Sequence, residues 1–357
     1  MRLLLSGGGT GGHLFPAIAV AEECTGRNDN ADILFVGTKA GLEARLIPEQ
    51  GWEIRYVLSG GIKGRGLAGA VAGLFKAFWG FLQSIKIIAD FRPGVILGMG
   101  GYASAPAIVA GRLFGISSAI HEQNAMPGLA NRLLGHFANR VFLTYPESGR
   151  FFSAGKTIVT GNPVRKEFLE NGLKATGENE KFTVFVFGGS RGAHRINEVV
   201  SEAMTGSLRA EKISLIHQTG ANDLEDINKR YRDAGIDAEV QPFIDDMLAA
   251  YMKADLVLCR AGATTIAELM AMGKPSLLIP YPYAADDHQA KNAQALVDAG
   301  AAEMILESDL DAGLLAGRIK SLMADEKRIC EMGKRAAGLA RKDTARIICE
   351  ELQKLAA

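Results

Sequence analysis

The feature that most constrains the fold is a pattern of strand, glycine loop and helix that occurs twice in the chain. The loop Gly7–His13 follows the apolar run Arg2–Leu5, and the loop Gly188–His194 follows the apolar run Phe182–Phe187. Glycine permits the positive φ angles that a tight turn between a strand and a helix demands. The repeat predicts two domains of similar design, each of which opens with a strand, a glycine loop and a helix.

Short apolar runs alternate with amphipathic stretches along the 357 residues, a length that suits two domains. This alternation predicts an α/β fold with parallel, doubly covered sheets. We place the boundary near Gly161-Asn162-Pro163, which gives domains of residues 1–162 and 163–340. The expected strands are residues 2–5, 32–37, 94–98, 117–121, 140–144 and 157–160, then 182–187, 213–218, 238–241, 255–259, 276–280 and 302–306.

Composition excludes several function classes. The 40 basic and 40 acidic residues balance, which argues against bulk nucleic-acid binding because that needs a cationic surface. The longest uncharged stretch, between Arg92 and Arg112, is broken by glycine and proline, so no membrane span is expected. The four cysteines are far apart and form no CxxC pair, which disfavours a zinc ribbon or a disulfide scaffold and suits free thiols in a reducing cytoplasm.

The first glycine loop contains GxGxxG, the pattern of dinucleotide-binding folds. That function needs an acid at the end of the second strand to hold a ribose, but residues 32–36 are followed by Gly37-Thr38-Lys39. A dinucleotide oxidoreductase is therefore disfavoured, and binding of an anion such as phosphate remains. His13 lies in the first helical turn after the loop, where it is a candidate general base.

Two further polar segments follow strands of the first domain. Gly98–Pro106 is a second glycine loop, so two loops at one sheet edge suggest two phosphates or one diphosphate held from both sides. The strand at 117–121 leads into His121-Glu122-Gln123-Asn124, a run that packing does not explain. These side chains suggest a site for hydroxyls or a sugar.

The second predicted domain has a corresponding glycine loop and corresponding polar residues. Gly188–Ala193 is the phosphate loop, and Arg260–Thr265 turns from a strand into a helix whose free N-terminus would attract a diphosphate. Glu268 on the next turn could accept hydrogen bonds from ribose hydroxyls. Gln289 and Asn292 are spaced i, i+3 and could contact sugar hydroxyls. No metal is expected, because Ser308-Asp309 of the DxD-like Asp309-Leu310-Asp311 is interpreted as a helix N-cap.

The spacing of apolar residues predicts a helix over residues 67–91 with a wide hydrophobic face and basic flanks. Such a face can lie on an anionic membrane, although burial between a core and a loop would give the same pattern. The membrane patch that we define here consists of Leu74, Phe75, Phe78, Trp79 and Leu82.

Taken in order, these segments resemble the MurG family of bacterial transferases, which add N-acetylglucosamine to the lipid-linked muramyl pentapeptide of peptidoglycan synthesis. The matches run through nearly the whole chain: Gly8–His13, Gly100-Gly101-Tyr102, Ser104, Pro106, His121–Asn124, Pro127-Gly128, Asn131-Arg132, Gly161–Arg165, Phe187–Ser190, Arg260, Gly262, Glu268, Asp287, Gln289 and Asn292.

The resemblance implies the GT-B glycosyltransferase architecture: two facing Rossmann-like domains with a deep cleft, the second domain holding the donor and the helix 341–357 packing back on the first. It implies donor contacts to UDP-N-acetylglucosamine from Thr10, Gly11, Gly12, Asn124, Arg165, Ser190, Ile244, Ala263, Thr264, Thr265, Glu268, Gln289 and Asn292. Gly8, Gly9, Gly100, Gly101 and Tyr102 would meet the diphosphate of the undecaprenyl-linked acceptor.

The expected reaction is an inverting, metal-independent transfer to the C4 hydroxyl of the muramyl unit, which converts lipid I to lipid II without a cofactor. His13 and, second, Glu122 are the candidate bases. The enzyme would work as a peripheral protein on the cytoplasmic side of the membrane. The alternatives are a UDP-N-acetylglucosamine 2-epimerase of the same architecture and a non-catalytic UDP-sugar-binding protein.

Overall fold

The computed structural model divides the chain into two compact units. The N-terminal unit comprises Met1–Lys166 and Arg341–Ala357, and the C-terminal unit comprises Glu167–Ala340. Within the residues that the structure describes, side chains are covered except at 66–72 and 74, in the first turns of the helix that begins at Gly66. The structure describes residues 1–27, 30–59, 66–101, 103–172, 181–190, 192–284 and 287–357.

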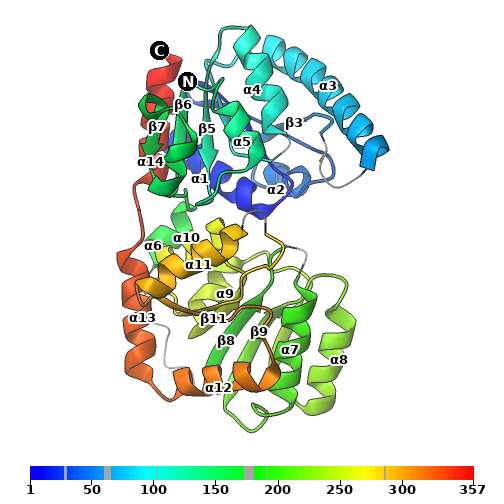
Figure 1. Ribbon diagram of the computed structural model, residues 1–357, viewed down its shortest axis with the longest axis vertical. Coiled ribbons are helices and arrows are strands. Elements are labelled where there is room, and N and C mark those ends of the chain that lie inside the picture. The colour runs from blue at the N-terminus through cyan, green and yellow to red at the C-terminus, as the bar shows by residue number, and fades with distance from the viewer. Residues whose placement is uncertain (28–29, 60–65, 102, 173–180, 191, 285–286) are drawn as a thin grey trace. The chain divides into compact units, whose positions relative to one another are not determined.

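The N-terminal unit is built on a parallel sheet. Within the described residues this sheet has seven strands in the order β3-β2-β1-β4-β5-β6-β7 (Figure 1). Leu3 and Leu5 pack against helices on one face, whereas Leu4 packs against helices on the other. Both faces are therefore covered, which explains the continuous apolar strands. The strands are β1 Arg2–Ser6, β2 Asp32–Gly37, β3 Glu53–Tyr56, β4 Val95–Gly98, β5 Ser117–Glu122, β6 Arg140–Leu143 and β7 Thr157–Val159.

Helices α1 and α14 share one face of this sheet, and α3, α4 and α5 contribute to the core on the other. The bounds are α1 Gly11–Arg27, α2 Glu43–Glu49, α3 Gly66–Phe91, α4 Ser104–Leu113, α5 Leu129–Leu134 and α14 Thr344–Ala356, with the 3-10 turns Pro146–Phe151 and Ala154–Lys156. Since α14 is the last helix, the chain end completes the first unit.

The C-terminal unit repeats the design. In the part of it that the structure describes, six parallel strands follow the order β10-β9-β8-β11-β12-β13. The strands are β8 Phe182–Phe187, β9 Ile213–Gln218, β10 Ala238–Gln241, β11 Leu256–Cys259, β12 Ser276–Leu278 and β13 Ala302–Met304. The helices are α6 Lys166–Asn171, α7 His194–Thr205, α8 Leu224–Ala234, α9 Met247–Lys253, α10 Ala263–Met272, α11 His288–Asp298, α12 Ala312–Met323 and α13 Glu326–Gly338.

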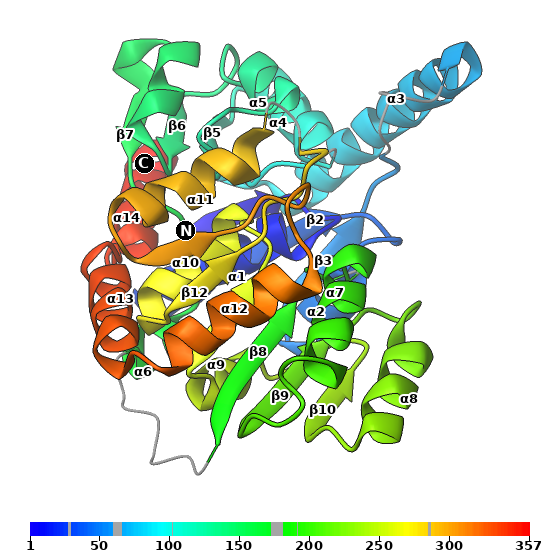
Figure 2. The same ribbon diagram turned by 60° about the horizontal axis from the view of Figure 1, so that its bottom comes forward.

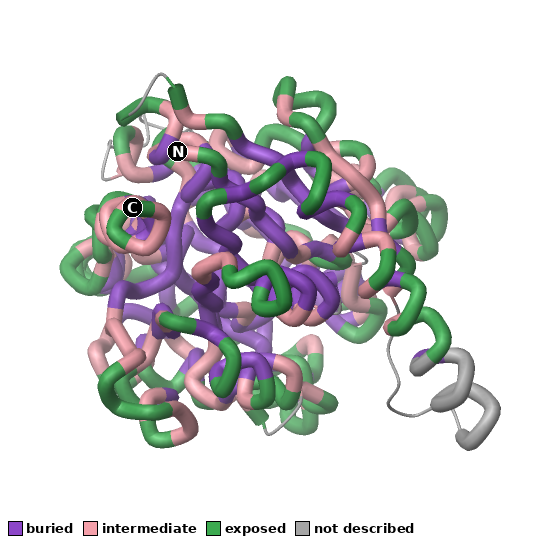
Figure 3. Tube along the Cα trace, turned by 90° about the horizontal axis from the view of Figure 1, so that it is seen from above, coloured by how far each residue is buried: buried purple, intermediate pink, exposed green. Residues whose placement is uncertain are grey.

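In both sheets the first strand stands at the point where the strand order reverses, which is the Rossmann-like arrangement. The expected fold class, two Rossmann-like α/β domains, is confirmed. Figure 2 shows helices on both sides of the strands of each unit, and Figure 3 shows that the buried residues lie in the interior and the exposed ones at the margin. Two local expectations differ: β3 is a strand that the sequence analysis missed, and the N-cap of α12 is Asp311 rather than Ser308-Asp309.

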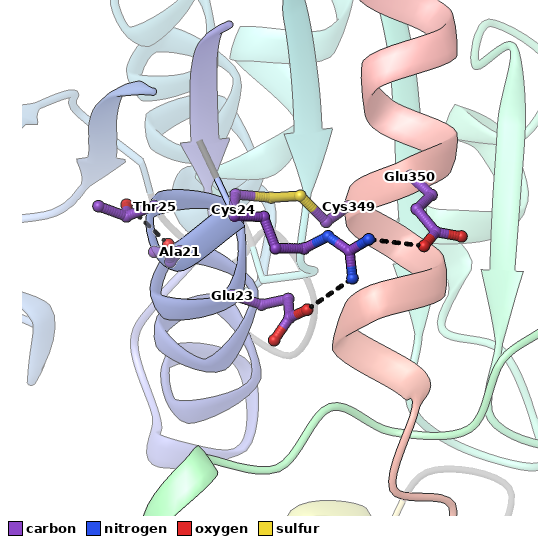
Figure 4. Close-up of a disulfide and its surroundings, with 7 residues drawn as sticks. Ala21, Glu23, Cys24, Thr25, Cys349 and Glu350 are labelled. Atoms are coloured by element: carbon purple, nitrogen blue, oxygen red, sulfur yellow. Dashed lines mark hydrogen bonds and ion pairs between the residues drawn. A yellow bond between two sulfur atoms is a disulfide. The ribbon is translucent and has the colours of Figure 1, made fainter. Parts of the chain in front are cut away.

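Cys24 of α1 and Cys349 of α14 form a disulfide, with their Cα atoms 5.5 Å apart (Figure 4). Both cysteines are fully buried. Arg27 of α1 donates to Glu350 of α14 over 3.0 Å beside it. The expectation of free thiols is therefore wrong for this pair, because 325 residues of sequence separate two side chains that folding brings together. Cys259 and Cys330 are free thiols.

Candidate functional site

The site of the N-terminal unit lies at the carboxyl ends of β1, β4 and β5. The glycine loop after β1 and the glycine loop after β4 are in close contact, because a Cβ at Gly101 would stand 2.7 Å from the carbonyl oxygen of Gly8. Gly100 and Gly101 have φ angles of 94° and 76°, which only glycine adopts without strain. Gln123 after β5 donates to the Met99 carbonyl over 2.7 Å and ties the third loop to the second.

His13 lies within this cluster. A Cβ at Gly100 would be 2.8 Å from its Nδ1, so the second glycine loop passes directly over the imidazole. Burial lowers the pKa of His13, and the neighbouring Gln123 side chain, Met99 carbonyl and Glu43 carboxylate partly offset that effect. The imidazole is thus held as the neutral form at neutral pH, which is the form that a general base requires.

Glu122 is buried and its carboxylate is occupied by loop contacts. It accepts from the backbone N–H of Asn124 over 3.0 Å, from the Asn131 amide over 2.8 Å and from the Gly128 N–H over 3.2 Å. Burial raises its pKa, and these hydrogen bonds oppose the rise. The carboxylate therefore holds the loop that carries Asn124.

Glu43 is a site residue that the sequence analysis missed. It is buried beneath the first glycine loop, where Oε2 accepts from the Gly9 N–H over 2.8 Å and Oε1 accepts from the Thr38 N–H over 2.8 Å. A Cβ at Gly8 or Gly41 would overlap its carboxylate, and a Cβ at Gly37 would overlap its Cγ. Glu43 belongs to the helix that follows β2, and its carboxylate supports the loop from inside the protein.

The remaining N-terminal candidates lie at the end of the first unit and at the start of α1. The Arg165 guanidinium lies 4.5 Å from the ring centre of Phe15 on α1, so it is placed by a cation–π contact within this unit. Thr10, Gly11 and Gly12 begin α1, and the backbone N–H groups of His13 and Leu14 donate to the Thr10 carbonyl over 3.3 Å. Tyr102 lies outside the described residues.

The site of the C-terminal unit lies at the corresponding edge of its sheet. Gly188-Gly189-Ser190 follows β8, and Gly262 precedes the first turn of α10, which Ala263, Thr264 and Thr265 form. Gly262 offers no side chain to cap this helix, and a helix N-terminus stabilises an anion through its N–H groups and its dipole. Ile244 is buried in the turn between β10 and α9.

The other candidate residues of the C-terminal unit form hydrogen bonds or ion pairs with residues of the same unit. The Glu268 carboxylate accepts from the Tyr251 hydroxyl over 3.2 Å and is buried. The Asn292 amide is fully buried and donates to the Ala261 carbonyl over 3.2 Å, so it supports the segment before α10. Gln289 accepts from the Tyr281 N–H over 2.9 Å. Arg260 forms a buried ion pair with Glu307.

The membrane patch lies on α3 at the margin of the N-terminal unit. Phe75 is 62% exposed, Phe78 57% and Trp79 43%, and Leu82 is also exposed, so these side chains are not part of the core. The Leu74 side chain lies outside the described residues. Lys76 and Lys86 on the same helix are exposed. Among the residues that the structure describes, no helix has the length and apolar character to cross a membrane.

The fold and its two glycine-loop sites define the class of two-domain Rossmann-like proteins that includes the GT-B glycosyltransferases. Residues 3–143 match the glycosyltransferase family 28 N-terminal domain, and residues 183–348 match the glycosyltransferase family 28 C-terminal domain. The chain belongs to glycosyltransferase family 28.

Relatives and solved structures agree with this membership. The chain is 49% identical to the UDP-N-acetylglucosamine--N-acetylmuramyl-(pentapeptide) pyrophosphoryl-undecaprenol N-acetylglucosamine transferase of Geobacter metallireducens, over 99% of this chain and 98% of that protein. It resembles Acinetobacter baumannii MurG, with a TM-score of 0.75, 30% identity and 99% of each chain covered. UDP-GlcNAc 2-epimerase from Neisseria meningitidis, at 15% identity, a TM-score of 0.66 and coverage of 99% and 100%, shares the fold alone.

Proposed function

We propose that this enzyme transfers N-acetylglucosamine from UDP-N-acetylglucosamine to the C4 hydroxyl of the muramyl unit of the undecaprenyl-diphosphate-linked muramyl pentapeptide. The products are UDP and a β-1,4-linked disaccharide, so the step converts lipid I to lipid II of peptidoglycan. The observation that carries this proposal is the 49% identity along 99% of the chain with a relative that is named as the N-acetylglucosamine transferase for this acceptor. The epimerase alternative has only the fold in its favour.

The C-terminal unit is the proposed donor site. The N–H groups of the loop at Ser190 and of the first turn of α10 would meet the diphosphate, since a helix N-terminus stabilises negative charge. Ile244 would contact the uracil, Glu268 the ribose and Gln289 the sugar hydroxyls. Arg165 would add a positive charge near the leaving UDP. Fixed dipoles of this kind can stabilise a leaving diphosphate without a metal ion.

His13 is the proposed general base. A neutral imidazole can take the proton of the C4 hydroxyl while that oxygen attacks the anomeric carbon in line and the bond to UDP breaks. Glu122 is the second candidate, but its carboxylate already accepts hydrogen bonds from Asn124, Gly128 and Asn131. We assign Glu122 the role of positioning the Asn124 loop.

The acceptor diphosphate would lie at the two glycine loops of the N-terminal unit. The Gly9 N–H already donates a hydrogen bond to Glu43. We therefore expect Gly100 and Gly101 to supply the principal backbone contacts to the acceptor diphosphate. The enzyme would reach its acceptor from the cytoplasmic face of the membrane as a peripheral protein. The exposed aromatic residues of the membrane patch and the nearby Lys76 and Lys86 support this placement.

The test measures UDP release from UDP-N-acetylglucosamine in EDTA, with and without a short-chain analogue of the lipid-linked muramyl pentapeptide. Release only in the presence of acceptor, together with a β-1,4-linked product, is the expected result. UDP release or formation of an epimeric sugar without acceptor would contradict the proposal and favour the isomerase. Activity that requires Mg²⁺ would contradict only the metal-independent part.

A further inference from the structure

Gln218 stands between two of the segments that we assign to the donor. It is the last residue of β9 and pairs in register with Phe187, the last residue of β8, from which the loop Gly188–Ser190 departs. Its side chain is 97% buried, since only 3% is exposed. A polar side chain so deeply buried at the ligand edge of a parallel sheet is expected to be fully hydrogen-bonded.

The nitrogen and the oxygen of the Gln218 amide form hydrogen bonds with two different segments of the chain. Its Nε2 donates to the carbonyl oxygen of Gly189 over 3.0 Å, and its Oε1 accepts from the backbone N–H of Ile244 over 2.8 Å. A carbonyl can only accept and a backbone N–H can only donate, so the amide has one allowed orientation. One side chain therefore joins the glycine loop after β8 to the turn after β10.

The bond to Gly189 orients the peptide group that follows it. This peptide is trans, so its C=O and the N–H of Ser190 point in opposite directions. Because the Gly189 carbonyl faces Gln218 and also accepts from the Gly192 N–H over 3.0 Å, the Ser190 N–H faces away from β9. The φ of 97° at Gly189 makes this turn possible.

The loop also rests directly on the end of β9. A Cβ at Gly192 would overlap the carbonyl of Thr219, the residue after Gln218. The loop therefore has no room to tilt toward the sheet, and the Gln218 amide is a polar contact that fixes the orientation of its Gly189 carbonyl.

We propose that Gln218 is a positioning residue of the donor site, which aligns the Ser190 N–H for the diphosphate and the Ile244 turn for the uracil at the same time. The inference rests on the proposed function, because it takes the UDP moiety to lie in the C-terminal unit. Gln218 itself touches neither reacting atom. Its effect is the coupling of two contacts that would otherwise form independently.

The test compares the binding of uridine, UMP and UDP by calorimetry in wild type, Gln218→Glu and Gln218→Met. The glutamate keeps an acceptor for the Ile244 N–H but places an oxygen against the Gly189 carbonyl. We expect Gln218→Glu to weaken UDP about tenfold or more while uridine changes less than about threefold. Gln218→Met should weaken both ligands, and the donor KM should rise more than kcat falls.

Gln241→Met is the matched control, because this glutamine ends the neighbouring strand β10 and its amide donates to the Glu239 side chain over 2.7 Å. It should leave all three affinities unchanged. A lower melting temperature with an unchanged ratio of UDP to uridine affinity in both Gln218 variants would overturn the inference. Wild type that binds no UDP would instead remove the proposed donor site, so the two failures are distinguishable.

Discussion

The carboxylate of Glu43 accepts a hydrogen bond from the backbone N–H of Gly9, with 2.8 Å between Oε2 and N. Its other oxygen accepts from the N–H of Thr38 and from the Thr38 hydroxyl, over 2.8 and 2.9 Å. A loop rich in glycine is usually considered an anion site because its N–H groups converge. Here the Gly9 N–H already donates to the Glu43 carboxylate, so this internal hydrogen bond determines the conformation of the loop.

Replacement of Glu43 by glutamine should therefore disturb the first glycine loop. An amide group would face one of the N–H donors, and a buried donor without an acceptor costs about 1–3 kcal/mol. We expect a lower free energy of unfolding in urea and a lower kcat. Glu49→Gln, at the exposed end of the same helix, is the control and should change neither.

The same replacement should shift the pH profile. The negative charge of Glu43 raises the pKa of His13, so its removal should lower that pKa further. Since the base acts when neutral, the acidic limb of kcat/KM should move to lower pH in Glu43→Gln. An acidic limb that moves to higher pH, or that does not move, would mean that His13 does not produce it.

His13→Ala should reduce kcat by about 10²–10⁴, the usual contribution of general base catalysis, with little change in melting temperature. Glu122→Gln should behave differently, because its carboxylate holds a loop rather than a proton: we expect a lower melting temperature and a higher substrate KM. Single-turnover rates and thermal scans on both variants make the comparison. A loss below tenfold in His13→Ala would remove its assignment as base.

Local patterns predicted the two Rossmann-like domains, because strands covered on both faces are continuous apolar runs and each glycine loop follows one. The edge strand β3 was not predicted from the sequence, because Glu53 and Arg55 interrupt its apolar residues. Glu43 and Gln218 were missed for another reason: each contacts at least one loop that is distant in sequence, and neither belongs to a recognisable motif. Their roles become visible only when the strand ends are brought to one sheet edge.

Acid should destabilise the C-terminal unit through His217. Burial lowers the pKa of this histidine to about 3, while Tyr231 and Asn197 are its hydrogen-bonding neighbours. The unfolded chain binds the proton near pH 6.5, so stability is lost as the pH falls from about 6.5 toward 3, by about 1.4 kcal/mol per pH unit. Unfolding in urea at pH 7, 6 and 5 should show a shallower loss in His217→Gln, whereas the exposed His136→Gln should retain the wild-type slope.

Reduction should weaken the attachment of α14 to α1. The Cys24–Cys349 disulfide closes a sequence separation of 325 residues, and such crosslinks typically stabilise a protein by about 2–5 kcal/mol. We expect dithiothreitol, or Cys24→Ser, to lower the free energy of unfolding of the N-terminal unit. The exposed Cys330→Ser is the control. Identical unfolding curves with and without dithiothreitol, after thiol titration has confirmed the disulfide, would show that the crosslink adds no stability.

Membrane binding should depend on the aromatic residues of α3. The rings of Phe75 and Phe78 lie 6.1 and 6.3 Å from that of Trp79, so the three form one exposed cluster. Burial of one such side chain in an apolar phase contributes about 1.5–3 kcal/mol, and the double variant Phe75→Ser, Trp79→Ser should therefore bind anionic vesicles at least about tenfold more weakly.

Leu339→Ser, which changes an exposed apolar residue of the C-terminal unit, is the control for general surface effects. Vesicle flotation measures both. Equal flotation of the double variant and wild type would assign membrane attachment to another surface, whereas a loss confined to vesicles with anionic lipid would add Lys76 and Lys86 to the contact.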